Sequence, residues 1–183
     1  MRVVAGAAGG RPLKAPAGRA TRPTSDRVRE AMFDMLTSLH AVDGTEVVDL
    51  FAGSGALGIE ALSRGASRVT FVERDPGAVT TVRANLAAVA DLAGCTEVVR
   101  GDAVGWARRR TAGEEGSELV LADPPYAWAG WGELLDALAP TTALLVAETG
   151  GPWQPGDGWE SVRARRYGST VVTIVRPRAR GGS

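Results

Sequence analysis

Short apolar runs with strand character alternate with stretches of helical periodicity along most of this 183-residue chain. Most of the apolar runs end in a glycine, a proline or an acidic residue, which are residues that stop strands and start helices. Strands that are joined through a helix run parallel and cross over with right-handed chirality. The alternation therefore restricts the chain to an α/β fold, and the length suits one domain of that kind.

The pattern predicts seven strands, at residues 46–51, 68–73, 96–100, 118–122, 143–148, 159–165 and 170–177. The first helix is expected to follow a cap at Thr24 or Ser25 and to end near Ser38. The other predicted helices cover residues 56–64, 76–90, 103–110 and 131–138. The last two strands have no helix between them and should pair antiparallel. We predict a doubly wound, mostly parallel, seven-stranded Rossmann-like sheet with an antiparallel C-terminal hairpin.

The N-terminal residues differ in composition from the rest of the chain. Residues 1–23 are rich in Arg, Gly, Ala and Pro, and Gly9-Gly10 can turn a small β-hairpin there. We therefore divide the chain into a basic N-terminal hairpin extension, residues 1–23, and one larger domain, residues 24–183.

Charge is unevenly distributed, although the formal net charge is zero. Residues 1–30 carry seven basic and two acidic groups, and residues 161–183 carry six basic groups and no acidic one. The middle, residues 31–160, carries eight basic and nineteen acidic groups. Basic ends around an acidic middle favour a polyanionic partner that the ends hold. Solvated, partly disordered tails would show the same pattern, so charge alone leaves both interpretations open.

Several classes of protein are excluded by composition. The single cysteine, Cys95, cannot form an internal disulfide, and we expect it to be a small buried hydrophobe at a strand start. The single histidine, His40, leaves no histidine cluster for a metal, so no metal site is predicted. No apolar run approaches the ~18 residues that a membrane span needs, and the N-terminus lacks a signal-peptide pattern. We expect a cytoplasmic, monomeric protein.

A glycine-rich loop follows the first predicted strand. Gly53, Gly55 and Gly58 form a GxGxxG pattern between a strand and a helix. They permit a tight turn, close approach of a ligand to the backbone, and close helix–strand packing, respectively. The free N–H groups at the helix start favour an anionic ligand group. On this pattern alone, an NAD-binding domain is a serious alternative.

Acidic residues at the strand ends point to a different nucleoside cofactor. Asp49 lies inside an otherwise apolar strand, where its carboxylate suits a cofactor with an amino group and a sulfonium; it can also order the glycine loop by accepting backbone N–H bonds. Glu73 ends the second strand and can bind both ribose hydroxyls, or it can pair with Arg74 or Arg68. Asp102 follows the third strand and is a candidate for an adenine amino group and for a helix N-cap.

The fourth predicted strand ends in Asp123-Pro124-Pro125-Tyr126. The prolines fix φ and offer carbonyl acceptors without donors. Asp123 and the Pro124 carbonyl can accept the two N–H bonds of an exocyclic amino group, which turns the nitrogen lone pair toward a methyl donor. Tyr126 can stack on the base. A rigid strand-ending turn with an exposed tyrosine is the structural alternative.

Three segments carry a resemblance to a known family. Asp49 to Gly58 resembles motif I of class I methyltransferases, and Asp123 to Tyr126 resembles their amino-methylating motif IV. Residues 22–33 and 49–65 resemble signatures of the RsmD family, and the similarity extends over nearly the whole chain. The loop 127–131, which contains Trp128 and Trp131, is richer in tryptophan than is typical of the family.

The resemblance implies an S-adenosylmethionine-dependent methyltransferase domain at residues 24–183. It implies methylation of N2 of a guanine in 16S rRNA, within an assembled or assembling small ribosomal subunit. It also implies that Arg22, Thr24, Asp26 and Arg27 lie near the cofactor or the RNA, although the same residues can form a capped, salt-bridged helix start. Together, the resemblance and the charge pattern identify seven candidate RNA-binding residues: Arg11, Lys14, Arg22, Arg27, Arg163, Arg165 and Arg166.

Two other functions remain open. The tetrapeptide also occurs in adenine-N6 methyltransferases of DNA, so guanine rests on the family resemblance alone. The chain has no room for the additional target-recognition domain that sequence-specific DNA enzymes often carry. A non-catalytic nucleic-acid-binding module would keep the fold without turnover. The tryptophans at 128 and 131 can stack on flanking nucleotides or cover the pocket.

Overall fold

The computed structural model describes residues 1–16, 25–92, 95–110 and 118–179. Seven strands form one sheet in the order β3-β2-β1-β4-β5-β7-β6. The strands are β1 (Glu46–Leu50), β2 (Arg68–Glu73), β3 (Thr96–Arg100), β4 (Glu118–Ala122), β5 (Thr142–Thr149), β6 (Trp159–Tyr167) and β7 (Thr170–Pro177). The helices are α1 (Asp26–Ser38), α2 (Ala56–Ser63), α3 (Pro76–Ala87), α4 (Ala103–Arg108) and α5 (Trp131–Leu138). The predicted fold class is confirmed.

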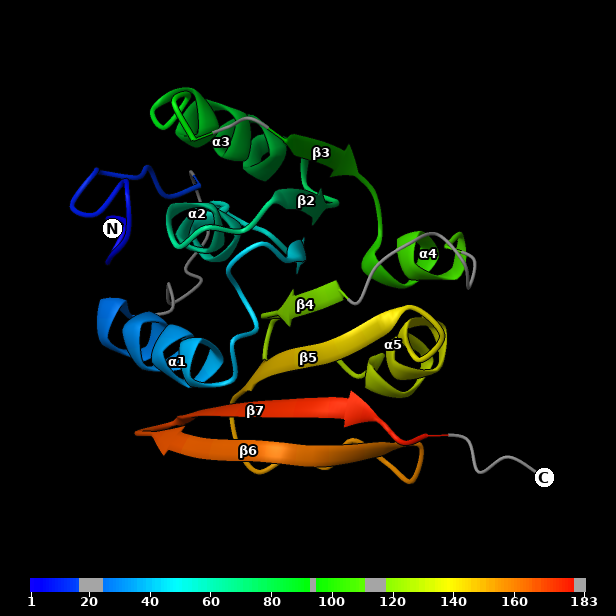
Figure 1. The fold of residues 1–183 in the computed structure, drawn as a ribbon. Coiled ribbons are helices and arrows are strands. Elements are labelled where there is room, and N and C mark those ends of the chain that lie inside the picture. Colours follow the sequence, from blue (N-terminus) through cyan, green and yellow to red (C-terminus); the bar gives the residue numbers. More distant parts are fainter. Residues whose placement is uncertain (17–24, 93–94, 111–117, 180–183) are drawn as a thin grey trace.

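Helices cover both faces of the sheet (Figure 1), with α1, α2 and α3 on one face and α4 and α5 on the other. Each face has its own apolar core. The larger core includes Phe33 of α1, Ile59 of α2 and Val82 of α3, and the smaller one includes Leu134 and Leu138 of α5. Strands that are buried on both faces consist of consecutive apolar residues, which explains why the sequence pattern predicted them.

The C-terminal hairpin completes the sheet without a helix. β7 pairs antiparallel with β5, with Thr149 opposite Val171, and β6 pairs antiparallel with β7. Because β5 runs parallel to β4, β7 begins at the carboxyl edge of the parallel strands. The turn between β6 and β7 therefore lies at the edge where the ligand site is expected.

The N-terminal hairpin, residues 1–14, packs against the larger core. Its two strands meet at a bridge between Arg2 and Pro12, and Val3, Ala8 and Leu13 are buried. α2 binds its backbone, because the Glu60 carboxylate accepts the N–H groups of residues 4 and 5 at 2.7 and 3.0 Å. The alternative of a solvated, partly disordered tail is therefore wrong for this segment, whereas residues 17–24 lie outside the described part of the chain.

Some sequence predictions need correction. Cys95 is exposed, because it lies in the turn before β3 and not within the strand. The predicted helices at 76–90 and 103–110 end earlier, at Ala87 and Arg108.

Within the described residues, none of the helices is both long and apolar enough to cross a membrane. The described residues also hold no group of three or more His, Cys, Asp or Glu side chains that could bind a metal ion.

Candidate functional site

Loops that follow β1, β2, β3 and β4 enclose a cavity of about 630 Å³ at the carboxyl edge of the sheet. Open α/β sheets bind their ligands at this edge. The N-terminal segment adds Met1, Ala15 and Pro16 to the wall. The predicted cofactor and catalytic residues that line the cavity are Asp49, Gly53, Glu73, Asp102, Asp123, Pro124 and Tyr126. The fold thus brings residues from four loops into one site.

The glycine loop has a backbone that side chains would disfavour. Gly53 and Gly55 have φ of 58° and 77°, in the left-handed region, and Gly55 precedes the first residue of α2. Phe51 has a φ of 61° although it carries a side chain, and such strain is concentrated at functional sites. A Cβ on Gly58 would lie 2.3 Å from Phe71 Cε1 of β2. Glycine at 58 is therefore required for α2 to approach the sheet.

Asp49 is almost fully buried, with 1% of its surface exposed. One of its oxygens accepts the backbone N–H of Gly58 at 2.9 Å, so the carboxylate orders the glycine loop as the sequence allowed. Burial raises the pKa of Asp49 well above its usual value, and the nearby carboxylates of Asp123 and Glu73 raise this pKa further. The Gly58 N–H acts in the opposite direction. A cationic neighbour in the cavity would favour the ionised form of this carboxyl group.

Glu73 and Asp102 hold the loops after β2 and β3. Glu73 accepts the N–H of Gly53 at 2.9 Å and the N–H of Asp75 at 2.8 Å, so it ties the β2 loop to the glycine loop. Arg68, one of its two suggested ion-pair partners, pairs with Glu46 instead. Asp102 caps α4 by accepting the Gly105 N–H at 2.8 Å. Each oxygen that takes one such bond keeps a second lone pair for a ligand.

The tetrapeptide after β4 forms the outer wall of the cavity. Pro124 is buried and Asp123 is partly buried, whereas Tyr126 is 52% exposed. The Tyr126 ring packs so closely on Gly150 that a Cβ there would lie 2.6 Å from ring atom Cδ2. Its hydroxyl contacts that of Thr170 at 2.9 Å. The turn is packed against Gly150 and Thr170 and also lines the cavity, so a structural role and a ligand-binding role of the tetrapeptide are compatible.

The tryptophans of the next loop pack on one another. Trp128 lies edge-on to Phe51 at 4.9 Å between ring centroids and to Trp131 at 5.4 Å, and Trp131 continues to Trp153 at 4.7 Å. All four rings are partly buried against the smaller core. This row joins the loops after β1, β4 and β5. Both Trp128 and Trp131 therefore cover the smaller core, and Trp128 also lines the cavity, which accounts for them better than free stacking on nucleotides.

The candidate RNA-binding residues are spread over two regions of the surface. Arg11 of the hairpin forms a two-point ion pair with Asp91, while the Lys14 and Arg27 side chains are exposed. On β6, an edge strand, Arg163 donates to the Ser38 hydroxyl at 2.8 Å. The side chains of Arg165 and Arg166, close to the β6–β7 turn, are exposed. Arg22 lies outside the described residues.

The start of α1 is capped and salt-bridged. This is the structural alternative that the sequence analysis gave for the segment. The Ser25 hydroxyl accepts the Val28 N–H at 3.3 Å, and Asp26 pairs with Arg2 at 3.4 Å and Arg29 at 2.8 Å. Thr24, named with Arg22 in the same signature, also lies outside the described part of the chain.

Sequence reasoning missed Asn85, Glu60 and Arg29. The Asn85 amide donates to the carbonyls of Lys14 and Ser54 at 2.9 and 2.8 Å and accepts the Lys14 N–H, so it joins the N-terminal segment to the glycine loop. The available signal was a polar residue at buried helical spacing. Asn85 lies three residues after Val82, and Glu60 lies within an otherwise apolar helix.

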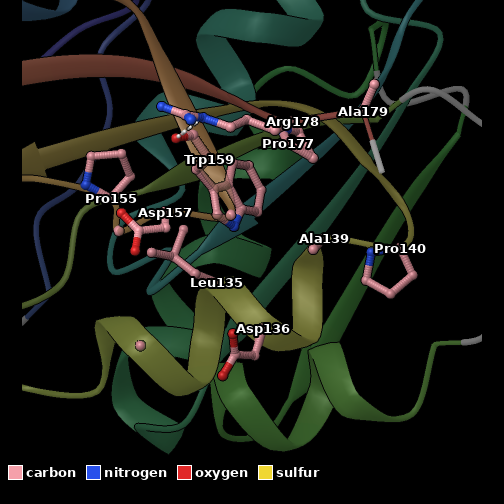
Figure 2. A pocket seen from close by; sticks show the side chains of 13 residues that line it. Leu135, Asp136, Ala139, Pro140, Pro155, Asp157, Trp159, Pro177, Arg178 and Ala179 are labelled. Atoms are coloured by element: carbon pink, nitrogen blue, oxygen red, sulfur yellow. Dashed lines mark hydrogen bonds between the residues drawn. The ribbon is translucent and has the colours of Figure 1, made fainter. Parts of the chain in front are cut away.

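A second hollow lies on the other face, between α5 and the segment before β6. Its volume is about 900 Å³, and Figure 2 shows Leu135 of α5 beside Asp157 of the segment before β6. Arg178 Nε donates to the Trp159 carbonyl at 3.2 Å. None of the residues that the sequence singled out for binding or catalysis lines this groove. The cavity at the carboxyl edge is therefore the candidate site.

The sheet order and the glycine loop, with acidic residues at the strand ends, define a class I methyltransferase. Residues 1–176 match the family described as conserved hypothetical protein 95. The chain belongs to this family, which is the RsmD family that its motifs resemble.

Similar proteins cover most of the chain. Ribosomal RNA small subunit methyltransferase D of Escherichia coli is 31% identical over 100% of this chain and 93% of its own length. The Bacillus subtilis protein named "Putative rRNA methyltransferase YlbH" is 46% identical over 69% of this chain and 67% of its own length. The solved structure of Escherichia coli yhhF has a TM-score of 0.82 at 30% identity, covering 98% and 99% of the two chains. The SMU.776 structure, solved with SAH, has a TM-score of 0.61 at 16% identity over 82% and 48%, a likeness of fold alone.

Proposed function

We propose that this protein transfers a methyl group from S-adenosylmethionine to the exocyclic N2 amino group of a guanine in 16S rRNA. The observation that carries the proposal is the shared cavity, in which Asp123, Pro124 and Tyr126 stand beside Asp49 and Glu73. Asp49 and Glu73 can hold a methyl donor, and the tetrapeptide residues can hold an amino acceptor next to it. The names of the relatives support rRNA as the acceptor.

The wall of the cavity fits a cationic cofactor better than a dinucleotide. Four carboxylates line it, those of Asp49, Glu73, Asp102 and Asp123. A diphosphate would be repelled by these groups, whereas a sulfonium and an ammonium would be attracted. This argues against the NAD-binding alternative. In the proposed arrangement, Asp49 holds the ammonium, Glu73 the ribose hydroxyls and Asp102 the adenine amino group.

S-adenosylmethionine, when bound, supplies a methyl group that its sulfonium already activates, so catalysis consists mainly of alignment. Asp123 and the Pro124 carbonyl accept the two N–H bonds of the target amino group and aim its lone pair at the methyl carbon. Tyr126 stacks on the base. With the cofactor bound, the amino nitrogen would take up the methyl group as the carbon–sulfur bond breaks, and Asp123, the carboxylate of the tetrapeptide, would accept the proton that the nitrogen loses.

The RNA is proposed to approach across the β6–β7 turn, because this turn lies at the carboxyl edge beside Tyr126. The exposed side chains of Arg165 and Arg166 lie next to it. A base inside folded RNA must be flipped out to reach a site at the end of a sheet. Lys14 and Arg27 would contact RNA on the side of the N-terminal segment.

The test is to incubate the protein with methyl-labelled S-adenosylmethionine and small ribosomal subunits that lack the modification. The digested RNA is then searched for the labelled nucleoside. Naked rRNA and unmethylated DNA serve as parallel acceptors. Label in N2-methylguanosine supports the proposal, and the ratio of subunit to naked-RNA labelling reveals whether ribosomal proteins contribute to the substrate. Label only in N6-methyladenine of DNA, or cofactor binding without transfer, would overturn it.

A further inference from the structure

We propose that Arg29 binds the carboxylate of the amino-acid portion of the cofactor, an inference that rests on the proposed function. Arg29 is a wall residue of the cavity, together with Met1, Ala15 and Pro16 of the N-terminal segment. Arg29 lies in the first turn of α1, and no sequence motif predicts a ligand contact for it, so its role follows from its surroundings.

Hydrogen bonds hold the Nη2 end of the Arg29 guanidinium in place. Its Nη2 donates to the Arg2 carbonyl and to Asp26, the latter at 2.8 Å. These contacts come from the N-terminal hairpin and from the first turn of α1. They fix the orientation of the guanidinium and leave Nη1 free to donate a charge-assisted hydrogen bond to a carboxylate.

The other nitrogens of this guanidinium lack hydrogen-bond partners. Both Nε and Nη1 of Arg29 are buried and unsatisfied, although the side chain is only 1% exposed. Glu60 lies 3.7 Å from Nε, which is an ion-pair distance but too long for a hydrogen bond. The Glu60 oxygens already accept two backbone N–H groups and Arg64 Nε. A buried cation with unused donors is costly, which indicates that a ligand completes it.

The charge distribution of the cavity places an anionic group at Arg29. The cavity wall carries four carboxylates at its other positions, which repel an anion. Arg74, the second arginine of the wall, is exposed and follows Glu73 at the ribose position, whereas Arg29 is shielded from water. A shielded charge interacts more strongly with a ligand than an exposed one. The only anionic group of S-adenosylmethionine is its carboxylate, so Arg29 and Asp49 would hold the two charges of the amino-acid portion.

The test is to measure by calorimetry the affinity of the full chain for S-adenosylhomocysteine and for its decarboxylated form, without RNA. We expect the wild type to prefer the carboxylate-bearing ligand at least about tenfold, the size of one charge-assisted hydrogen bond. Arg29→Gln should bring this preference close to one while leaving the affinity for the decarboxylated ligand unchanged. Arg64→Gln is the matched control, because Arg64 also pairs with Glu60 but does not line the cavity.

The outcomes separate this inference from the proposed function. A wild type that binds neither ligand overturns the proposed cofactor. A wild type that binds both equally, or an Arg29→Gln variant that keeps the preference or loses both affinities alike, overturns the role of Arg29 alone. If Arg29→Gln does not fold, Arg29→Lys decides: it keeps the charge but has no donor in the position of Nη1, and an undiminished preference for the carboxylate would contradict the contact through the guanidinium.

Discussion

The hydroxyl oxygen of Tyr126 lies 2.9 Å from the hydroxyl oxygen of Thr170, which is the first residue of β7. The two residues are 44 positions apart in the chain. This contact ties the aromatic side chain at the end of the tetrapeptide to the C-terminal hairpin. The hairpin therefore holds the acceptor wall as well as extending the sheet.

Thr170→Val should lower kcat/KM for the RNA acceptor by about twofold to tenfold, the effect of one neutral hydrogen bond of about 0.5–1.5 kcal/mol. Cofactor affinity should not change. Tyr126→Phe removes the same contact and should have a similar effect, and the double variant should be no worse than either. Additive losses would mean that the two hydroxyls act separately.

Asp123→Ala should retain cofactor binding and lose most turnover, by about a hundredfold or more, because the amino group loses an acceptor and its proton a nearby base. Binding is measured by calorimetry and turnover by transfer of labelled methyl groups to subunits. Asp136→Ala is a suitable control, because Asp136 lines the second groove and not the candidate site. Near-normal turnover of Asp123→Ala would refute its catalytic role.

Cofactor affinity should fall as pH falls, because of Asp49. Burial raises the pKa of this carboxyl in the free protein, whereas a bound cation favours the ionised form, so binding releases a proton once pH is below the raised pKa. Affinity measured across pH should show this slope in the wild type, and Asp49→Asn should abolish the slope together with much of the affinity. A wild-type affinity that does not vary with pH would contradict the role of Asp49.

The same shift has a consequence for stability. A carboxyl whose pKa is higher in the folded than in the unfolded protein stabilises the fold below the unfolded pKa, and this contribution is lost as pH rises through the folded pKa. Asp49→Asn should therefore gain stability relative to the wild type as pH rises. The difference in unfolding free energy, variant minus wild type, should be more positive at neutral pH than at acid pH. Thermal unfolding of the ligand-free proteins at two pH values checks the sign, and equal differences at both would contradict it.

Neutralising Arg163, Arg165 and Arg166 should weaken RNA binding and flatten its salt dependence while leaving cofactor affinity unchanged. Each lost phosphate contact lowers the slope of log K against log salt by about 0.7–0.9. Arg163 donates to the Ser38 hydroxyl and Arg166 Nε donates to the Gly168 carbonyl, so the Arg165 change should have the largest single effect. Arg176→Gln is the control, because Arg176 is paired with Glu160. An unchanged slope in the triple variant would remove these residues from the interface.

Gly58→Ala should destabilise the protein by about 1–3 kcal/mol, because the new methyl group would overlap the Phe71 ring of β2. Gly132→Ala is the matched control, because a Cβ at this position of α5 meets nothing within 4 Å. The control should be neutral or slightly stabilising. Chemical denaturation of both variants measures the difference, and equal stabilities would contradict the packing role of Gly58.

Much of the site was predictable because its residues lie next to strand ends. Glu73 ends β2 and Asp123 follows β4, and parallel strands bring their carboxyl ends to one edge whatever the details of packing. The positions of the arginines were less predictable. Arg11, a predicted RNA-binding residue, pairs with Asp91, 80 residues away, a contact that no local pattern indicates, and this pairing holds the pKa of Asp91 below its usual value.

The sequence by itself determined the order of strands and helices, the glycine loop and the tetrapeptide, because hydrophobic periodicity and turn chemistry act between residues that are close in the chain. Only the tertiary structure decided how the N-terminal hairpin docks on Glu60, how Asn85 joins it to the glycine loop, and why Arg29 lies at the cavity. These contacts join residues 27 to 71 positions apart. Their partners are selected by burial and shape when the layers pack, which no local pattern encodes.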